Sequence, residues 1–564
     1  MAGMKKSWLV PEGPSDNLLD SLMARRKIGL DQTEKFLAPN ILNDLHDPFL
    51  LTDMAIAVSR LIQAIKKGER LGVFADYDAD GVPGAAILDA FFRRVGYSNF
   101  RVYLPHRHEE NYGLSEMAIR DLRADGVKLL LTVDCGIADY KPVRLAGELG
   151  MEVIVTDHHL SPVVLPPALA IINPLRPDDP YPFKGLCGTG VVFKLIQALI
   201  TTGDFNLPLG WERWLLDLVA IATVSDLVPI VGENRALVHF GLRVLRRTPR
   251  IGLRRLISGA GLNLETVSED DIGFTIGPRL NAASRMSHAD RAYQLLTTTD
   301  PLEAESLARH LEEKNEERKA AVSGLMERLT KTADSCGSVL VTGGDDWPLG
   351  VLGLVASRWA DKYRCPVFLW GRNGQGMIKG SCRSDGQVNV VELMRLAAMT
   401  PTGDDGLFLN IGGHIMAGGF SLAPDRLGEL APRLSAAHNQ LPKNSSIPKV
   451  LVDAELSLEQ INWDTHQLIS RLSPFGVGNP KPIFLLRELT VGHFRTFGRA
   501  TEHWSWQFNQ SSGAPIEAVN FFASNDRPQL GSGQRVNLLA NFELSTWRGR
   551  RELRLRVVDW EPAG

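Results

Sequence analysis

The sequence predicts an α/β protein that continues into an all-β barrel: a domain built on a parallel sheet, a long connecting helix, a smaller α/β domain and the barrel. Three observations carry this prediction. Short, nearly continuous apolar runs recur between residues 70 and 230, as in buried parallel strands. A densely charged stretch free of helix breakers starts at residue 301, and short strand-and-turn patterns fill the chain after residue 446. We expect an N-terminal segment that packs on the first domain at 1–50, the first domain at 51–300, the connecting helix at 301–335, the second α/β domain at 336–445 and the barrel at 446–564.

The parallel sheet of the first domain is predicted from four apolar runs, each of which ends at an aspartate. The stretches between the runs are long enough for crossover helices, so the runs are expected to be consecutive strands of one sheet. They are "RLGVFA" before Asp76, "VKLLLTV" before Asp134, "MEVIVT" before Asp157 and "LVAIATVS" before Asp226.

The connecting helix has a clear start signal. Asp300 is placed to act as N-cap, Pro301 occupies the first helical position and Glu303 the third. No proline or glycine follows until Gly324, and the middle of the stretch is densely charged. We expect a long, largely solvated helix that joins two domains.

The last two predicted domains differ in sequence pattern. The second α/β domain runs from "GSVLVTGG" to "GGHIMAGGFSL", and the barrel contains "PFGVGNPKPIF" and "STWRGRRELRLRVVDW". Residues 493–556 hold nine arginines against five acids, a composition that suits single-stranded nucleic acid when aromatic rings are interleaved. Trp506 and Phe508 alternate, which indicates that about half of the rings belong to the barrel core. The aromatic residues are Phe494, Phe497, Trp504, Trp506, Phe508 and Trp547.

Composition limits the class of protein. No run approaches the roughly 18 to 20 apolar residues of a membrane span, and the two N-terminal lysines precede no long apolar region, so we expect no signal peptide. The five cysteines show no CxxC spacing, which argues against a disulfide framework or a structural zinc site and fits a reducing cytoplasm. With a net charge of −3, any nucleic-acid contact must be a local patch.

Acids and histidines gather where the predicted strands end. The carboxyl ends of parallel strands meet at one edge of a sheet, which is where ligands bind in such folds. A single aspartate there is usually a helix cap, and adjacent histidines are common in surface loops, but the joint occurrence favours a metal site. Oxygen-rich sites with one or two histidines suit Mn²⁺ or Mg²⁺, and several carboxylates can hold two ions about 4 Å apart. The residues are Asp76, Asp78, Asp80, Asp134, Asp157, His158, His159 and Asp226.

These residues lie in motifs that resemble the DHH phosphoesterase superfamily and, within it, the RecJ family of bacterial single-strand-specific 5′→3′ DNA exonucleases. The motifs are "DYDADG", "TVDCG", "VTDHH" and "ATVSDLVP", followed by "GPRLNAASRM", "GVLGLVASR", "KGSCRS", "GGHIMAGG" and "PFGVGNPKPIF". The resemblance runs from about residue 50 to the C-terminus and implies a DHH domain, a DHHA1 domain and an oligonucleotide-binding (OB) fold. Ser284 and Cys382 stand where such proteins commonly carry glycine, and Pro348 where many carry histidine; none of these is a candidate metal ligand.

The resemblance also implies roles at the metal site, with two Mn²⁺ or Mg²⁺ ions that activate a water and stabilise charge on the phosphate. Asp76 and Asp78 are expected on the first ion, with Asp76 alternatively acting behind the ligands, and Asp134 is expected to bridge the two ions. His159 is expected to contact the scissile phosphate or a metal-bound water, and Asp157 is expected to orient His158 or to cap a following helix. The second ion takes Asp80, His158 and Asp226, so that the catalytic set is Asp78, Asp80, Asp134, His158, His159 and Asp226.

Substrate contacts are predicted in the later motifs and in "YLPHRHEENYGLS". Serine and arginine together make a good phosphate clamp because the guanidinium fork is bidentate and always charged. We expect Ser381 and Arg383 to anchor the 5′ end, with Arg107 and Arg279 on nearby phosphates, although an isolated arginine is most often plain surface charge. The glycines around His414 either form a turn or let backbone amides approach a phosphate. The remaining candidates are Tyr112, Asn281 and Arg285.

The resemblance predicts single-stranded DNA as the substrate, 5′-mononucleotides as the product and a role in recombination and repair. It also implies action beside a single-strand-binding protein and a RecQ-type helicase in the cytoplasm, at the nucleoid, by a monomer. Three alternatives stay open: a DHH-type phosphodiesterase for short oligonucleotides or cyclic dinucleotides, an inactive replication scaffold, and a zinc hydrolase. The basic barrel argues against the first, the intact acid and histidine set against the second, and the carboxylate count against the third.

Overall fold

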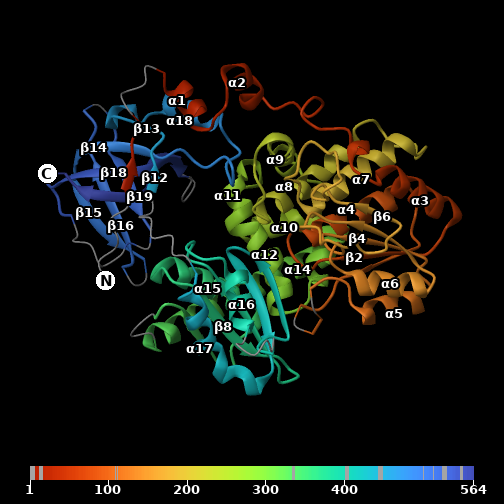
Figure 1. Cartoon of the computed structure of the whole chain (residues 1–564). Helices are drawn as coiled ribbons and strands as arrows, with labels where there is room; N and C mark the ends of the chain where they lie inside the picture. Colours follow the sequence, from red (N-terminus) through yellow and green to blue (C-terminus); the bar gives the residue numbers. More distant parts are fainter. Residues whose placement is uncertain are drawn as a thin grey trace. The chain divides into compact units, whose positions relative to one another are not determined.

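The computed structural model contains two compact units (Figure 1), which we describe separately. The larger unit consists of Leu45–Val228 and Gly232–Ser445. The smaller consists of Met1–Asp44, Pro229–Val231 and Ser446–Gly564. The structure describes residues 7–563 except 12–16, 108, 111, 333–336, 400–405, 442–448, 499–500, 512, 522, 524–529 and 546–550. The side chains of 331–332 are also excluded.

A five-stranded parallel sheet, in the order β3-β2-β4-β5-β6, forms the centre of the larger unit. Three of the four predicted strands are confirmed as β2, β4 and β5; their residues are almost all buried because helices cover both faces. Helices α5 and α6 pack on one face, and α3, α4 and α7 on the other. The bounds are β2 (Leu71–Ala75), β3 (Phe100–Tyr103), β4 (Leu129–Val133), β5 (Glu152–Thr156), β6 (Ala170–Ile172), α3 (Met54–Lys67), α4 (Gly81–Arg94), α5 (Glu116–Ala124), α6 (Tyr140–Glu148) and α7 (Gly188–Thr202).

The fourth predicted strand is wrong. The run "LVAIATVS" lies within helix α8 (Leu216–Ser225), and Asp226 follows the end of that helix. Helix α8 packs against α4, α7 and α9, so it is buried on all sides and carries no polar face. A short apolar run of this kind has no periodicity that separates a buried strand from a buried helix.

Further helices surround the sheet and lead to the second α/β domain. The predicted connecting helix is present as α14 (Pro301–Thr332), with most of its described residues exposed. A buried stripe that includes Leu311, Val322 and Leu325 packs against neighbours that include α10, α12 and α15. None of the helices in the described ranges is long and apolar enough to cross a membrane. The other elements are η1 (Pro48–Leu50), η2 (Trp211–Leu215), α9 (Gly232–Leu245), α10 (Ile251–Gly259), η3 (Leu264–Thr266), α11 (Glu269–Asp271), the π-helix η4 (Ile272–Ile276), α12 (Gly277–Met286) and α13 (Asp290–Thr297).

The second α/β domain contains a five-stranded sheet in the order β10-β11-β9-β8-β7. Only β7 and β8 pair in parallel; β8, β9, β11 and β10 are antiparallel. Helix α15 packs on the sheet, and so do α16 and α17, through a separate apolar cluster. The bounds are β7 (Leu340–Gly343), α15 (Leu349–Tyr363), β8 (Val367–Arg372), β9 (Ile378–Arg383), α16 (Val390–Ala398), β10 (Asn410–His414), β11 (Ala417–Leu422), η5 (Pro424–Arg426) and α17 (Leu427–His438).

The smaller unit is dominated by one seven-stranded sheet, in the order β13-β14-β18-β19-β17-β16-β15, as the predicted all-β domain requires. Trp504, Trp506 and Phe508 of β16 are buried in its core, which confirms the interpretation of the alternating rings; Trp547 lies outside the described residues. The bounds are β12 (Lys449–Leu451), β13 (Ala454–Glu455), η6 (Leu458–Gln460), α18 (Trp463–Ser470), β14 (Phe484–Thr490), β15 (His493–Phe497), β16 (His503–Phe508), β17 (Ile516–Asn520), β18 (Arg535–Ser545) and β19 (Glu552–Pro562).

The prediction that residues 1–50 pack on the first domain is wrong for the part up to Asp44, which belongs to the smaller unit. Strand β1 (Ser7–Leu9) pairs in parallel with β12. Leu22 and Met23 of α1 (Leu18–Arg25) are buried in the barrel core, which α2 (Leu30–Leu37) also contacts. The Arg26 guanidinium donates to the Asn479 side chain (2.8 Å) and to the Pro480 carbonyl (2.7 Å). Pairing across more than 400 residues leaves no local signal in the sequence.

This correction predicts that Leu22→Ala destabilises the barrel and not the parallel-sheet domain. Removing a fully buried leucine leaves a cavity that costs about 2–5 kcal/mol. Hydrogen exchange should become faster in β14, β16 and β18 and stay unchanged in β2, β4 and β5. Leu30→Ala, at an exposed position of α2, is the control. Faster exchange in the parallel sheet alone would contradict the observed packing.

Candidate metal centre

The loop after β2 brings three aspartates back toward the sheet. Gly81, at the start of α4, allows this approach, because a Cβ there would collide with the Asp76 backbone. The Asp78 carboxylate accepts from the amides of Asp80 (2.8 Å) and Gly81 (3.2 Å), so it stabilises the first turn of α4. The amide of Ala79 donates to the Asn281 side chain (2.9 Å), which ties the loop to α12.

Helix α7 holds Asp80. The backbone amides of Gly188 and Thr189, at the helix N-terminus, donate to the two carboxylate oxygens of Asp80 at 2.6 and 2.7 Å. The Thr189 hydroxyl donates to the Asp80 carbonyl (2.5 Å). Unpaired amides and the helix dipole favour an anion at this point. The glycine-rich "GLCGTG" that supplies these groups was the available signal, and sequence reasoning missed it.

Asp134 lies at the centre of the site. It directly follows β4 and has a φ of 61°, the left-handed region that few non-glycine residues adopt. Its side chain is buried, and its Oδ1 has no hydrogen-bond partner among the described residues. The Tyr112 hydroxyl donates to its carbonyl oxygen (3.0 Å). A strained backbone and a buried oxygen that accepts no hydrogen bond are typical of a functional position.

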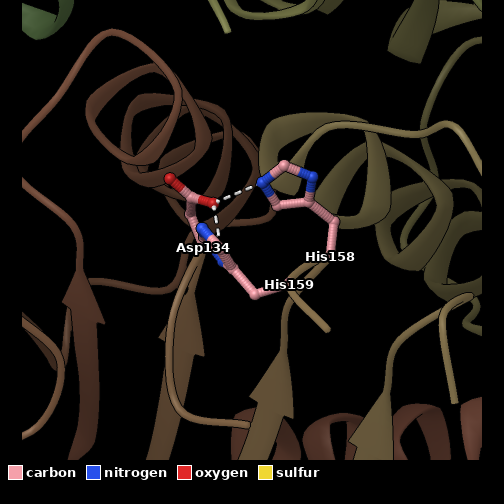
Figure 2. A group of neighbouring side chains, drawn as sticks. All are labelled: Asp134, His158 and His159. Carbon is pink, nitrogen blue, oxygen red and sulfur yellow. Dashed lines mark ion pairs between the residues drawn. The ribbon is translucent and has the colours of Figure 1, made fainter. Parts of the chain in front are cut away.

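The histidine pair reaches Asp134 from the end of β5. Figure 2 shows both rings directed at its carboxylate: His158 Nε2 lies 3.1 Å from Oδ1, and His159 Nδ1 lies 3.9 Å from it. Asp157 pairs with the ring of His159 (2.8 Å) and accepts from the amides of both histidines. Asp157 therefore orients His159, not His158 as expected, and the segment after it is a loop with no helix to cap.

The possible ligand atoms form three overlapping groups. Asp76, Asp78 and Asp134 make one group. Asp80, His158 and Asp226 make a second, with His158 Nε2 3.7 Å from Asp80 and 3.6 Å from Asp226. Within each group the atoms lie within 4.8 Å of one another, and a third group joins Asp134 to both histidines. Asp134 thus stands between two candidate ion positions.

Burial and crowding shift the titration of these groups. Burial, followed by the charge of neighbouring acids, raises the pKa of Asp76 and of Asp134 well above the usual range, and raises the pKa of Asp226 to about 9. Burial lowers the pKa of His158, which favours the neutral form that binds metals. Burial also opposes protonation of His159, but the Asp157 hydrogen bond and charge raise its pKa to about 9.

The residues fit one or two divalent cations. The Oδ1 atoms of Asp76 and Asp134 are buried and accept no hydrogen bond in the described chain. A positive ion between the groups offsets both causes that raise their pKa values, burial first and the repulsion of neighbouring acids second. Carboxylate oxygens with imidazole nitrogens suit Mn²⁺ or Mg²⁺. The nearby thiols of Cys135 and Cys187 are buried and protonated, since burial raises the pKa of both, and they belong to none of the three groups.

Three family descriptions match successive parts of this chain: the DHH family, N-terminal domain, over residues 70–223, the DHHA1 domain over 336–439 and the RecJ OB domain over 452–559. The single-stranded-DNA-specific exonuclease RecJ of Bacillus subtilis is 34% identical over 96% of this chain and 67% of its own length. Its namesake from Haemophilus influenzae is 32% identical over 97% of this chain and 96% of its own. The chain belongs to the RecJ family. The predicted fold class is confirmed.

Solved RecJ structures agree with this family assignment. The crystal structure of RecJ from Thermus thermophilus in complex with Mn²⁺ matches with a TM-score of 0.80 and 28% identity, over 99% of this chain and 80% of that one. The Mg²⁺ complex of the same protein matches with a TM-score of 0.75. The metals found in RecJ relatives are therefore those that the donor set of this chain suits.

An arginine cluster lies beside the acids. Arg107 stacks over the ring of Tyr77 with its Cζ 4.8 Å from the ring centroid. Burial, and then the charges of Arg107, Arg318 and Arg383, lower the pKa of Arg285 to about 9, while Asp78 opposes this. Several guanidinium groups close together and partly desolvated are poised for an anion such as a phosphate.

A cavity of about 120 Å³ opens at this cluster, at the junction of helices α12, α14 and α15. Arg285 spans the junction by donating to the Gly350 carbonyl of α15 (2.9 Å). Arg318 of α14 is a further candidate that sequence reasoning missed, because nothing marks it within a charged helix. The cavity is lined by Ser225, Asn281, Arg285, Arg318 and Leu354, among others.

The other predicted substrate residues differ in their surroundings. The Arg279 guanidinium donates two hydrogen bonds to Glu312 (2.5 and 3.0 Å) and one to the Thr275 carbonyl, so it is engaged in packing α14 and not turned to a phosphate. Arg383 lies against Gly353 of α15, where a Cβ would stand 2.7 Å from its Nη2. Ser381 alternates with buried Cys382 on β9, and His414 is exposed on edge strand β10.

Proposed function

We propose that this chain is a metal-dependent exonuclease that degrades single-stranded DNA from the 5′ end to 5′-mononucleotides, in DNA recombination and repair. The observation that carries the proposal is a buried carboxylate, Asp134, shared by two groups of metal-binding residues beside an arginine cluster. The RecJ relatives are named as single-stranded-DNA-specific exonucleases, which supports single-stranded DNA as the substrate.

We assign Asp76, Asp78 and Asp134 to one ion and Asp80, His158 and Asp226 to the other, with Asp134 between them. The grouping of ligand atoms and the buried oxygens of Asp76 and Asp134 that accept no hydrogen bond support this assignment. When bound, two divalent ions neutralise the phosphate and activate water for in-line attack. His159, oriented by Asp157 and close to the Tyr112 hydroxyl (3.1 Å), presents a polar ring to the scissile phosphate.

The arginine cluster binds the strand next to the metal centre. Ser381, Arg383 and Arg107 hold the terminal phosphate, and Arg285 with Arg318 lines the neighbouring cavity. Asn281 supports the aspartate loop through its hydrogen bond from Ala79. We leave Arg279 out of these contacts because Glu312 already occupies it.

The barrel contributes a face on which bases stack. Phe497, His503 and Phe521 form a cluster of rings with centroids 5.0 to 6.3 Å apart. Arginines surround it: Arg495 lies over Phe497, and Arg554 and Arg556 lie over Phe521. Partly exposed rings with arginines at their edges suit bases and phosphates of a single strand.

The double substitution Phe497→Ala and Phe521→Ala should weaken single-strand binding by about 1–3 kcal/mol for each lost ring. Affinity is measured by fluorescence anisotropy with a labelled 30-mer in EDTA, which prevents hydrolysis. Leu451→Ala removes an exposed apolar side chain without a π face from the same unit and is the control. Equal affinities of the two variants would show that these rings are not part of the binding surface.

The experiment that tests the proposed function uses the purified chain in Mn²⁺ with single-stranded DNA labelled at the 3′ end, and duplex DNA as control. Progressive shortening of the single strand alone, abolished by EDTA, is expected. Cleavage of dinucleotides with intact longer DNA would instead favour the small-substrate phosphodiesterase. No hydrolysis together with no bound metal, measured by mass spectrometry, would favour the scaffold.

Domain limits, partners and location are part of the same proposal. We place the DHH domain at 51–300, the connecting helix at 301–335, the DHHA1 domain at 336–445 and the OB fold at 446–564, limits that contain the three family matches. The protein is proposed to act as a monomer in the cytoplasm, at the nucleoid, beside a single-strand-binding protein and a RecQ-type helicase.

A further inference from the structure

The corner between helices α9 and α10 carries an unusual charge pattern. Residues 234–263 contain no aspartate, glutamate or lysine, although the whole chain is nearly neutral at a net charge of −3. The same thirty residues contain seven arginines: Arg235, Arg243, Arg246, Arg247, Arg250, Arg254 and Arg255.

Buried contacts fix this corner. Asp217 of α8 is fully buried; its Oδ2 accepts from the Thr248 hydroxyl (2.6 Å) and lies 3.3 Å from the Arg250 guanidinium. Arg250 also donates to the Leu296 carbonyl (3.2 Å), and Arg246 to the Val267 carbonyl (2.9 Å). These contacts hold the end of α9 and the start of α10 in one arrangement.

Three other arginines point outward from the fixed corner: Arg243, Arg247 and Arg254, which we call the arginine ridge. All three are exposed. The described ion pairs of this segment join Arg250 to Asp217 and Arg255 to Glu305, and the ridge residues take part in neither. Arg243 lies in the last turn of α9, and Arg247 follows two residues after the helix ends at Leu245, so their like charges lie near one another and repel.

The position at a helix end explains only part of the ridge. Cations stabilise the C-terminus of α9, which accounts for Arg243 and Arg247. It does not account for Arg254, in the middle of α10, or for thirty residues without an acid. Burial and the charges of Arg235, Arg243 and Arg246 together lower the pKa of the neighbouring His239, which shows the positive field of the segment.

The ridge is separate from the metal centre. Asp217 and Asp226 lie at opposite ends of α8, nine residues apart, which corresponds to about 14 Å of helix. Thr248 and Arg250, in the segment that carries the ridge, contact Asp217, so the ridge lies toward the Asp217 end of α8 and away from a phosphate held at Asp226. A stacked trinucleotide at the metal centre advances only about 7 Å along its axis, at about 3.4 Å per nucleotide, which is about half the distance between the two places.

We propose that the arginine ridge binds the phosphate backbone of the substrate DNA downstream of the cleaved end, without regard to sequence. This inference rests on the proposed function, because it takes DNA as the ligand and the 5′ end as the occupant of the metal centre. Polyanion binding relieves the repulsion between the ridge arginines, and arginine's planar fork pairs with phosphate oxygens in a bidentate way. The ridge contributes affinity for long strands and nothing to the hydrolytic step.

The test compares Arg243→Gln/Arg247→Gln/Arg254→Gln with a matched control, Arg94→Gln/Arg120→Gln/Arg144→Gln, which changes three exposed arginines of α4, α5 and α6 in the same unit. Affinity for a labelled 30-mer is measured in EDTA at several KCl concentrations. The slope of log K against log[KCl] should become shallower by about 2 in the ridge variant, at about 0.7 for each lost phosphate contact, and stay unchanged in the control. Trinucleotide hydrolysis in Mn²⁺ should equal that of the unmodified protein.

An unchanged slope in the ridge variant overturns the proposal, and so does an equal change in both variants. Loss of binding to a polyglutamate peptide with the DNA slope intact would overturn it in favour of an acidic protein partner. Loss of trinucleotide hydrolysis would overturn it because the ridge would then act through the metal centre. Failure of the unmodified protein to degrade either substrate would instead contradict the proposed function, while the slope measured in EDTA still tests the ridge.

Discussion

Asp134→Asn should reduce hydrolysis of single-stranded DNA by about 10³-fold or more. The substitution keeps the size of the side chain but removes the charge that lies between the two groups of metal-binding residues, so both ion positions are weakened at once. Initial rates in Mn²⁺ with a 3′-labelled strand measure the effect. Asp125→Asn, an exposed carboxylate on the same unit, is the control and should retain full activity. A variant at Asp134 that keeps more than a tenth of the activity would contradict the bridging assignment.

The thermal stability of Asp134→Asn shows whether its loss of activity comes from the missing charge or from a damaged fold. Burial and neighbouring acids raise the pKa of Asp134, and that of Asp226 to about 9. In the metal-free protein these carboxyls bind protons that the unfolded chain has released, so the free energy of unfolding falls as pH rises from about 4 toward 9. Asp134→Asn removes one such group, so in EDTA at pH 7 its Tm should exceed that of the unmodified protein, and the difference should shrink on acidification. Added Mn²⁺ should reverse the order, because only the intact site gains much from the ion.

The sequence predicted the acids of this site well because most of them directly follow a regular element or lie in the loop after it. Asp76, Asp134 and Asp157 follow parallel strands, and the fold rule that gathers strand ends then places them together. Asp226 was also placed at the site correctly, but the element before it was predicted wrongly: it follows helix α8 and not a strand. An apolar run of eight residues does not distinguish a buried helix from a strand.

What the sequence did not predict depends on contacts between distant residues. Arg279 looked like a phosphate ligand, but Glu312, 33 residues later, pairs with it across two helices. The N-terminal segment joins the barrel through β12, more than 400 residues away. Thr189 and Gly188 hold Asp80 through backbone amides, which any residue type can supply, so only the glycine-rich context pointed to them.

Gly188 offers the sharpest test of how tightly the metal centre is packed. It begins α7, donates its amide to Asp80, and lies directly against Asp134: a Cβ at this position would stand 2.5 Å from the Asp134 Cβ and 2.6 Å from its Oδ1. Its φ is not in the left-handed region, so alanine is allowed by the backbone and the effect is purely one of space. Because the Asp134 backbone is fixed by β4, the carboxylate must move.

Gly188→Ala should therefore reduce kcat/KM on single-stranded DNA by about 10²-fold, the usual consequence of displacing a reacting group by about 1 Å. Gly190→Ala, two residues along the same helix, places its Cβ at ordinary contact distances of 3.5 and 3.6 Å from Leu186 and Cys187, and should keep near-normal activity. Both substitutions favour the helix by similar amounts, so a difference between them cannot arise from helix propensity. Equal activity of the two variants would mean that Asp134 tolerates displacement, and the close packing of α7 against the metal centre would then have no catalytic meaning.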